Sequence, residues 1–426
     1  MDTKSVASDA YVYGYPLVLM EATRVTGAPA NQFSHARSLP MAANRTIVRQ
    51  NQDTLYSQAW LDLSGEPIVM TVPVMDGKRF WMMPTLDAWT NVTQNPSSIN
   101  PQVKSGTGKG PFTYAFTGPN WKGTLPDGLT PLPMPTDMAW ILGRIEINGE
   151  ADLPAVHAIQ DQLKLAPLSA WQQNHDAANP AVDASSSGDP EKEVAAMDGR
   201  TFFNKLNALM VANPPAADDA EALKRFATIG IKPGGTVDSQ PADQLDAGAA
   251  DAKQRIQTWP NPDLADENGW QFGTTAGRYG ANYMLRANVA LIGLGANLPE
   301  DAVYPSMFDI PADDNGTPRA LRIHFPAGQL PPVDAFWSIT AYTADGFFVD
   351  NPANIYAVGH QVPPVANPDG SIDIYVQSAE PEEGMRAANW LPIPTSGKFS
   401  LTMRLYAAHK SVIDGSWKPP ALTPAS

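Results

Sequence analysis

The spacing of apolar side chains predicts where the helices and strands of this chain lie. Residues 5–25 carry apolar and aromatic side chains at helical intervals, with Tyr11, Tyr15, Val18 and Ala22 on one stripe. Pro16 lies within this pattern, and we expect it to kink or divide the helix because proline lacks a backbone N–H group and clashes with the preceding turn. The first predicted element is therefore a helix with one apolar stripe.

From residue 46 to residue 147 the pattern changes to short runs of strand length. These runs are aromatic or β-branched, and Gly, Pro and Asn clusters such as Asp76-Gly77 separate them. They cover residues 68–72, 79–83, 112–116 and 138–147. Many short strands joined by turns predict an all-β domain, either a sandwich or a jelly-roll-like arrangement.

The middle of the chain returns to helical spacing. Apolar residues recur at intervals of three and four, and Asp218-x-x-Glu221 has the form of a capping box. The predicted helices cover residues 153–165, 218–231, 245–259 and 276–294. Between the first two, residues 174–189 are rich in Ala, Ser, Pro and Asp, which is typical of an exposed, flexible acidic loop.

Strand patterns resume after Pro299. They cover residues 319–325, 335–342, 371–377 and 398–406, and the last of these alternates between apolar and polar side chains. The sequence therefore predicts an α+β protein with two β-sandwich, jelly-roll-like domains joined by a helical middle region. We expect an N-terminal helix and first sandwich over residues 1–150, a helical connecting region over 151–298, and a second sandwich over 299–426.

Composition and charge remove several classes of function. The net charge of −15 disfavours a nucleic-acid partner, since binding to phosphates relies on clustered Lys and Arg. The absence of cysteine excludes disulfides, thiolate catalysis, iron–sulfur clusters and cysteine-based zinc sites. No apolar run approaches the roughly 18 residues that a membrane span needs. We expect a soluble protein without a membrane span.

Five segments spread along the chain resemble a bacterial two-domain family of unknown function. In this family a domain of unknown function 1254 precedes a domain of unknown function 1214. The segments are Asp9 to Pro16, Asn51 to Ser57, Gly118 to Gly123, Phe336 to Tyr342 and Asn389 to Pro394. The resemblance implies two β-sandwich domains joined through helices, and it implies no particular reaction.

The resemblance also bears on where the protein works. Members of the family often look exported, whereas the N-terminus of this chain has no signal-peptide pattern. We therefore expect a periplasmic or secreted protein if a signal peptide has been removed, and a cytoplasmic protein otherwise.

The run from Arg49 to Tyr56 is the strongest candidate for a site, because it crowds a cation, a carboxylate, amides and a phenol between apolar segments. On an extended segment Arg49, Asn51 and Asp53 share one face. In the functional interpretation Asp53 is a general base or binds a ligand hydroxyl, Arg49 holds it ionised, and Asn51 and Tyr56 orient the ligand. In the structural interpretation Asp53 accepts backbone N–H groups in a buried turn and pairs with Arg49.

A second carboxylate, Asp87, lies among aromatic residues. If it faced Asp53, the two could divide the acid and base roles of a hydrolase or lyase. Trp89, and Trp81 before it, could stack on a sugar or another flat ligand, although buried aromatic residues more often belong to a core.

The remaining candidates lie further along the chain. Tyr283 and Arg286 share a helical stripe that could bind a carboxylate or phosphate between the domains, or could dock the helix through tyrosines and an ion pair. His324 could be aimed by its strand at the interdomain space, or could be a hydrogen-bonded core histidine. Trp337 and Tyr342 on the second sandwich are ambiguous in the same way.

Local motifs add no cofactor or metal to these candidates. The six histidines show no zinc-binding spacing, and neither a GxxxxGK[ST] loop nor a GxSxG elbow occurs. We therefore predict no metal site from the sequence, and the cofactor stays undetermined.

Three hypotheses about function follow. The first is a hydrolase or lyase with a small-molecule pocket at the interdomain junction, acting on a polar or sugar-like substrate through Asp53 and Asp87. The second is a non-catalytic ligand-binding or carbohydrate-binding protein of the cell envelope. The third is a role in assembly, as a homo-oligomer.

Overall fold

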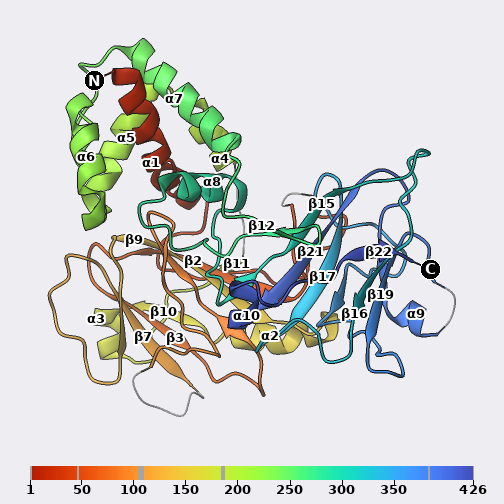
Figure 1. The fold of residues 1–426 in the computed structure, drawn as a ribbon. Helices are drawn as coiled ribbons and strands as arrows, with labels where there is room; N and C mark the ends of the chain where they lie inside the picture. The colour runs from red at the N-terminus through yellow and green to blue at the C-terminus, as the bar shows by residue number, and fades with distance from the viewer. Residues whose placement is uncertain (1, 46–47, 104–109, 184–187, 382–383, 426) are drawn as a thin grey trace.

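The computed structural model describes residues 2–45, 48–103, 110–183, 188–381 and 384–425. Figure 1 shows a layer of helices above one group of strands, with a second group of strands beside the first. Helices and strands alternate along the chain in several sheets, so the predicted mixture of α and β structure is confirmed. Within the predicted acidic loop 174–189, residues 184–187 lie outside the described residues.

The helical layer combines the N-terminal helix with the helices between residues 190 and 293. α1 (Thr3–Val25) packs against α5, α7 and α8, and it runs through Pro16 without being divided there. Gly14 allows α5 to approach closely, because a Cβ atom at this position would lie 2.4 Å from Leu206 Cδ2. The other helices of the layer are α4 (Pro190–Ala196), α5 (Gly199–Ala212), α6 (Ala220–Phe226), α7 (Ala242–Gln257) and α8 (Tyr283–Gly293), with short 3₁₀ turns η2 (Ala217–Asp219) and η3 (Ala227–Ile229).

The N-terminal group of strands forms two sheets. A seven-stranded sheet has the order β11-β1-β2-β9-β5-β6, with β4 also paired to β9, and a four-stranded sheet has the order β10-β3-β7-β8. The strands are β1 (Ser34–His35), β2 (Thr54–Asp62), β3 (Ile68–Val72), β4 (Trp81–Met82), β5 (Thr85–Asp87), β6 (Val92–Gln94), β7 (Phe112–Thr117), β8 (Thr130–Pro133), β9 (Met138–Glu146), β10 (Lys164–Pro167) and β11 (Val182–Asp183). The turn η1 (Glu150–Asp152) and helices α2 (Leu153–Gln160) and α3 (Leu168–Gln173) lie within this part.

Both faces of the seven-stranded sheet are covered. One face shares a core with the four-stranded sheet, where Leu55 and Ile141 meet Met70 and Phe116. The other face packs against the helical layer through the stacked rings of Trp60 and Trp140, whose centroids are 4.6 Å apart. β2 and β9 are therefore buried on both sides along much of their length.

The C-terminal group of strands also forms two sheets. A seven-stranded sheet has the order β12-β13-β15-β21-β17-β18, with β14 also paired to β21, and a four-stranded sheet has the order β20-β19-β16-β22. The elements are β12 (Ala265–Glu267), β13 (Trp270–Phe272), β14 (Ala302–Val303), β15 (Ser306–Ile310), β16 (Leu321–Phe325), β17 (Trp337–Thr343), β18 (Ala357–Gly359), β19 (Ile372–Gln377), α9 (Met385–Ala388), β20 (Trp390–Pro392), β21 (Phe399–Tyr406), α10 (Lys410–Ile413) and β22 (Leu422–Pro424).

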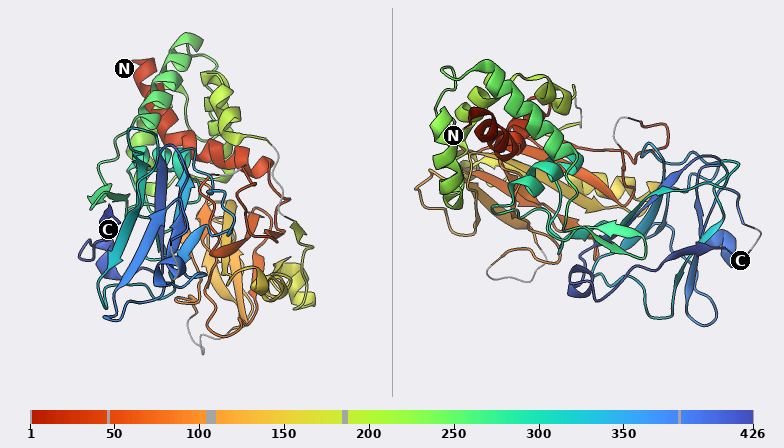
Figure 2. Two further views of the ribbon diagram at one scale, coloured as in Figure 1. Left: turned by 90° about the vertical axis from the view of Figure 1, so that its right-hand side faces the viewer. Right: turned by 45° about the horizontal axis from the view of Figure 1, so that its top comes forward.

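Strand pairing crosses residues 150 and 299, the two bounds expected between the three parts of the chain. β10, which follows residue 150, pairs with β3 of the first domain, and β12 and β13, which precede residue 299, join the C-terminal sheet. The two views in Figure 2 show that the helices lie mainly over the N-terminal strands. Within the described ranges, no helix has the length and apolar character needed to cross a membrane.

Candidate functional site

One face of the C-terminal seven-stranded sheet is polar and yet buried. On β17, Ser338, Thr340 and Tyr342 alternate with core residues, and on β21 their cross-strand partners are Arg404, Thr402 and Ser400. All six side chains are buried. Because buried polar groups are costly unless they are hydrogen-bonded, another part of the protein must satisfy this face.

Residues 49–53 of the N-terminal domain cover this polar face. Arg49 donates to the hydroxyls of Thr402 (3.0 Å) and Ser400 (3.1 Å), and it adopts a left-handed backbone conformation with φ of 53°. Arg404 donates to the carbonyl oxygens of Arg49 (3.0 Å) and Gln50 (3.2 Å), and Tyr342 donates to the Gln50 carbonyl (2.6 Å). The candidate run from the sequence therefore lies at the junction between the two domains.

Asn51 and Asp53 have different roles in this run. The Asn51 side-chain oxygen accepts from the backbone N–H groups of Asp53 and Thr54, both at 3.0 Å, so it shapes the turn that leads into β2. Asp53 is 1% exposed, and its Oδ2 accepts from the Ser338 hydroxyl at 2.7 Å. Its Oδ1 has no hydrogen-bond partner among the described residues, which leaves one buried carboxylate oxygen free to accept.

Tyr56 and Arg144 face each other across β2 and β9. The guanidinium of Arg144 lies 4.9 Å from the centre of the Tyr56 ring, and Asn51 donates to the Tyr56 hydroxyl at 3.4 Å. Burial raises the pKa of Tyr56, but the charges of Arg144 and Arg404 more than offset this effect, so the pKa lies below the ordinary value of 10.0. The site therefore favours the phenolate more than water does.

The junction carries more positive than negative charge. Arg49, Arg144 and Arg404 contribute three positive charges, and Asp53 contributes one negative charge. Asp301, which interacts electrostatically with Arg144, contributes a second, so these five groups sum to +1. Arg144 and Arg404 are buried, and no partner for Arg144 Nε lies among the described residues. Since buried charge is costly without compensation, the junction is suited to an anion.

A hydrogen-bond chain leads from Arg144 to a cavity. Arg144 donates to the Asn297 side-chain oxygen (2.8 Å), and the Asn297 amide donates to the Tyr304 hydroxyl (2.6 Å). Asn297 and Tyr304 line a cavity of about 170 Å³ whose other walls include Leu285 and Val289 of α8. A small molecule in this cavity would lie against the polar end of the chain.

Trp89, Tyr283 and Arg286 come together in a different place, within the helical layer. The Arg286 guanidinium lies 5.1–5.2 Å from the centres of the Trp89, Tyr13 and Tyr283 rings. The hydroxyls of Tyr13 (2.9 Å) and Tyr283 (2.7 Å) both donate to the Asp219 carboxylate. This arrangement joins α1, α8 and the loop after β5 through cation–π contacts and tyrosine hydrogen bonds, and no ion pair of Arg286 occurs among the described residues.

Asp87 is not near Asp53. Asp87 pairs with Ala139 of β9, whereas Asp53 accepts from the backbone of Ile147, just beyond the other end of that strand. Eight residues of extended chain separate these two positions, or about 25 Å at about 3.3 Å per residue. The structure thus does not form the acid–base pair that the sequence suggested, because the two carboxylates lie at opposite ends of one strand.

Asp87 instead holds a tight turn. Its Oδ1 accepts from the backbone N–H groups of Trp89 and Asn91, both at 2.9 Å, and its side chain is buried. Burial raises the pKa of this carboxyl to about 6, and the hydrogen bonds from Asn91 offset part of that effect.

The raised pKa of Asp87 predicts a pH dependence of stability. A carboxyl whose folded-state pKa is raised contributes stability below its unfolded pKa of 3.8 and loses that contribution as the pH rises through about 6. We expect this loss to be about 2 kcal/mol of unfolding free energy between pH 4 and pH 7. Asp87→Asn keeps the acceptor oxygen and should remove this part of the slope in urea titrations at stepped pH. An unchanged slope in that variant would contradict the assignment.

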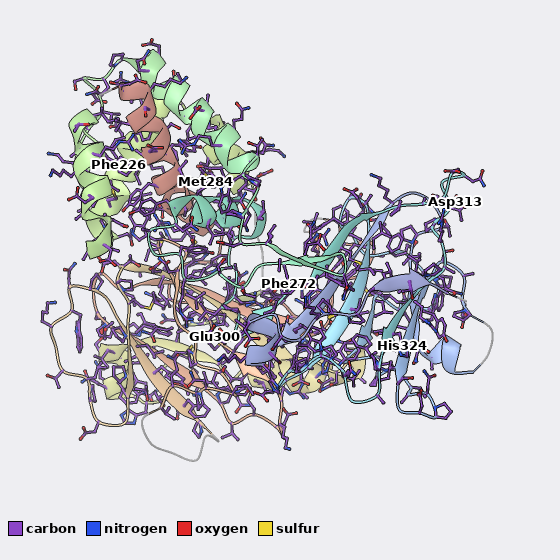
Figure 3. All side chains as sticks on the ribbon, viewed as in Figure 1. Phe226, Phe272, Met284, Glu300, Asp313 and His324 are labelled. Carbon is purple, nitrogen blue, oxygen red and sulfur yellow. The ribbon has the colours of Figure 1, made fainter. Side chains whose placement is uncertain are left out.

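His324 and Trp337 lie away from the junction. His324 is on β16 in the four-stranded C-terminal sheet (Figure 3), where its ring pairs with Asp373 at 2.8 Å and its side chain is 44% exposed. β16 belongs to the four-stranded sheet, whereas the polar face that meets residues 49–53 is on β17 and β21 of the seven-stranded sheet, so its strand does not aim His324 at this junction. Trp337 packs against the C-terminal core and lies 5.4 Å from the Phe325 ring.

Several residues of the junction were not singled out from the sequence. They are Arg144, Asn297, Tyr304, Ser338 and Arg404. The alternation on residues 398–406 was the only signal, since it marks Arg404 as a member of a polar face.

No group of three or more His, Asp or Glu side chains suited to hold a metal ion occurs among the described residues.

Comparisons with known proteins agree on a family and leave its activity open. Residues 30–167 match the model described as "Protein of unknown function (DUF1254)", and residues 304–410 match "Protein of unknown function (DUF1214)". No curated protein matches the chain.

Solved structures give the fold a counterpart. The crystal structure of the VPA0106 protein from Vibrio parahaemolyticus aligns over 100% of both chains with a TM-score of 0.74 and 23% identity, which is a likeness of fold. A putative uncharacterized protein from Burkholderia cenocepacia aligns over 98% of this chain and 88% of its own, with a TM-score of 0.47 and 15% identity. The order of the two matched domains is the one that the five segments suggested, and the chain belongs to this two-domain DUF1254–DUF1214 family.

Proposed function

We propose that the interdomain junction binds a small organic acid that carries both a carboxylate and a hydroxyl group. The observation that carries this proposal is the excess of buried positive charge around a carboxylate with one free oxygen. A ligand carboxylate would compensate Arg144 and Arg404, and guanidinium groups bind carboxylates strongly through charge-assisted hydrogen bonds. A ligand hydroxyl would donate to Asp53 Oδ1.

The surroundings support a small ligand with several polar groups. The Tyr56 ring and the side-chain oxygen of Asn297 both contact Arg144, and the cavity lined by Asn297 and Tyr304 holds about 170 Å³. Sugar acids combine a carboxylate and hydroxyls in this way, so the proposal keeps the polar or sugar-like ligand expected from the sequence. It does not use Asp87 and Trp89, at the end of β5 and in the loop after it, or Tyr283 and Arg286 of α8, which lie away from the junction.

The lowered pKa of Tyr56 favours a second candidate function, a lyase acting on the same class of acid. The Tyr56 phenolate would take the proton from the carbon next to the ligand carboxylate, whose charge Arg144 compensates. The electron pair of that C–H bond would form a carbon–carbon double bond, and the C–O bond on the next carbon would break. The leaving oxygen would take up a proton from water and depart as an alcohol or as water.

The role of Asp53 can be tested with two six-carbon acids that differ in their hydroxyl groups. We expect gluconate to bind more tightly than hexanoate, and Asp53→Asn to weaken gluconate binding by about 10-fold to 100-fold, because the bond to a charged acceptor is lost. Hexanoate binding should not weaken in the variant. Isothermal titration calorimetry measures both affinities.

Asp62→Asn is the matched control, since Asp62 is an exposed carboxylate at the other end of β2. It should leave both affinities unchanged. Equal binding of gluconate by the wild-type protein and the Asp53 variant, or failure of both acids to bind, would overturn the proposed ligand class.

A further inference from the structure

A second and larger cavity lies within the helical layer, apart from the interdomain junction. Its volume is about 410 Å³, and it lies among α1, α4, α7 and α8. Tyr11, Tyr15, Ile256, Leu291 and Ala195 form most of its apolar wall, and its charged lining residues are Asp189, Glu191, Lys192 and Lys253. This combination suits a molecule with an apolar body and one polar end.

Tyr11 supplies an unsatisfied polar group at this cavity. The residue is 0% exposed, and its ring stacks on that of Phe202 with the centroids 3.9 Å apart. Its hydroxyl has no hydrogen-bond partner among the described residues. A buried hydroxyl without a partner is costly, so a ligand that accepts its hydrogen bond would gain from it.

Lys253 supplies a positive charge beside the Tyr11 ring. Its Nζ lies 5.7 Å from the centre of the Tyr11 ring and donates to the carbonyl oxygens of Ala195 (2.8 Å) and Met197 (3.5 Å), which leaves one N–H free. No carboxylate in the described part of the chain lies within ion-pair distance of Lys253. Partial burial lowers the pKa of this ammonium group, an effect that a bound anion would reverse.

Of the two lysines that line the cavity, Lys253 is the one without an ion pair among the described residues. Lys192 and Asp189 pair with each other at 2.8 Å. Glu191 is exposed, whereas Lys253 is half-buried beside Tyr11. Glu191 lies close enough to Tyr15 for its charge to raise the pKa of that phenol, whereas the groups around Tyr11 are a donor and a positive charge. The part of the cavity at Tyr11 therefore complements an anion and opposes a second cation.

We propose that this cavity binds a small amphipathic carboxylate. The carboxylate accepts hydrogen bonds from Lys253 Nζ and the Tyr11 hydroxyl, and the apolar part of the ligand packs against Tyr15, Ile256 and Leu291. This site is independent of the proposed function of the interdomain junction, because the two share no residue.

The test uses two probes with the same chain length and opposite charge, octanoate and octylamine, titrated calorimetrically into the full-length protein at pH 7. We expect octanoate to bind at least tenfold more tightly than octylamine. Tyr11→Phe removes only the unsatisfied hydroxyl and should weaken octanoate binding about fivefold to twentyfold, and Lys253→Met should weaken it by at least tenfold. Lys224→Met, which removes an exposed lysine of α6, is the control and should leave the affinity unchanged.

Three outcomes would overturn the proposal. The first is octylamine binding as tightly as octanoate. The second is octanoate binding that neither Tyr11→Phe nor Lys253→Met weakens. The third is octanoate binding that Arg144→Met abolishes while both of these variants retain it, which would assign the ligand to the interdomain junction. The Tyr11→Phe variant keeps the test valid even if Lys253→Met fails to fold, because it leaves the backbone contacts of Lys253 intact.

Discussion

Replacing Arg404 with methionine is expected to lower the free energy of unfolding by about 3–5 kcal/mol. Arg404 is 4% exposed, and it donates to the Thr340 hydroxyl at 2.8 Å and to two carbonyl oxygens of the covering segment. Methionine fills much of the same volume, but it takes the donor away from the Thr340 hydroxyl and the Arg49 carbonyl, and it removes the positive charge near Asp53. The Gln50 carbonyl keeps its hydrogen bond from Tyr342. Urea unfolding followed by tryptophan fluorescence measures the change.

A lysine beside the start of the same strand provides the comparison for Arg404. Lys398 is exposed, and its ion pair with Asp309 spans 3.6 Å. Lys398→Met should therefore change the unfolding free energy by less than about 1 kcal/mol, the usual range for a surface ion pair. A similarly small effect of Arg404→Met would mean that the polar face of β17 and β21 does not depend on this guanidinium for its stability.

Replacing Tyr56 with phenylalanine is expected to remove the phenol that ionises first as the pH rises. The difference in ultraviolet absorbance between the wild-type protein and Tyr56→Phe should show one phenol titrating with a midpoint below 10.0. Arg144→Met should raise that midpoint, because burial would then act with less opposition from positive charge. If the protein is a lyase, Tyr56→Phe should lower turnover by about 10²-fold to 10⁴-fold, the usual contribution of a general base.

Ionisation of Tyr56 also makes the free energy of unfolding depend on pH. Because the folded-state pKa of Tyr56 is lowered, its contribution is fully present above pH 10 and is lost as the pH falls through the folded-state pKa. Tyr279→Phe is the matched control, since burial raises the pKa of Tyr279 to about 12 and its removal should leave the early titration in place. An unchanged early titration in Tyr56→Phe would contradict the assignment of the lowered pKa.

Hydrogen bonds that pass from one domain to the other hold the interdomain junction together. Its polar groups come from strands of two domains, and each domain satisfies hydrogen bonds that the other leaves open. A ligand bound between Arg144 and Asp53 would add to this set of contacts and should stabilise the protein in proportion to its affinity.

The sequence by itself determined the local structure of most strands and the family. Alternation over residues 398–406 predicted β21 and its two unlike faces, and the five quoted segments pointed to the domain pair that the comparisons confirm. The unusual polarity of residues 49–56 also marked the segment that later proved to lie at the junction. These are local properties, which the order of side chains along the backbone expresses directly.

Only the tertiary structure decided which of the candidate residues meet. Alternation tells that Arg404 is on the polar face of its strand, but it does not tell whether solvent or another domain covers that face. Asp53 and Asp87 are close in sequence and lie at opposite ends of β9, whereas Asp53 and Ser338, 285 residues apart, share a hydrogen bond. Contacts of this kind depend on strand pairing and domain packing over long sequence distances, which no local pattern encodes.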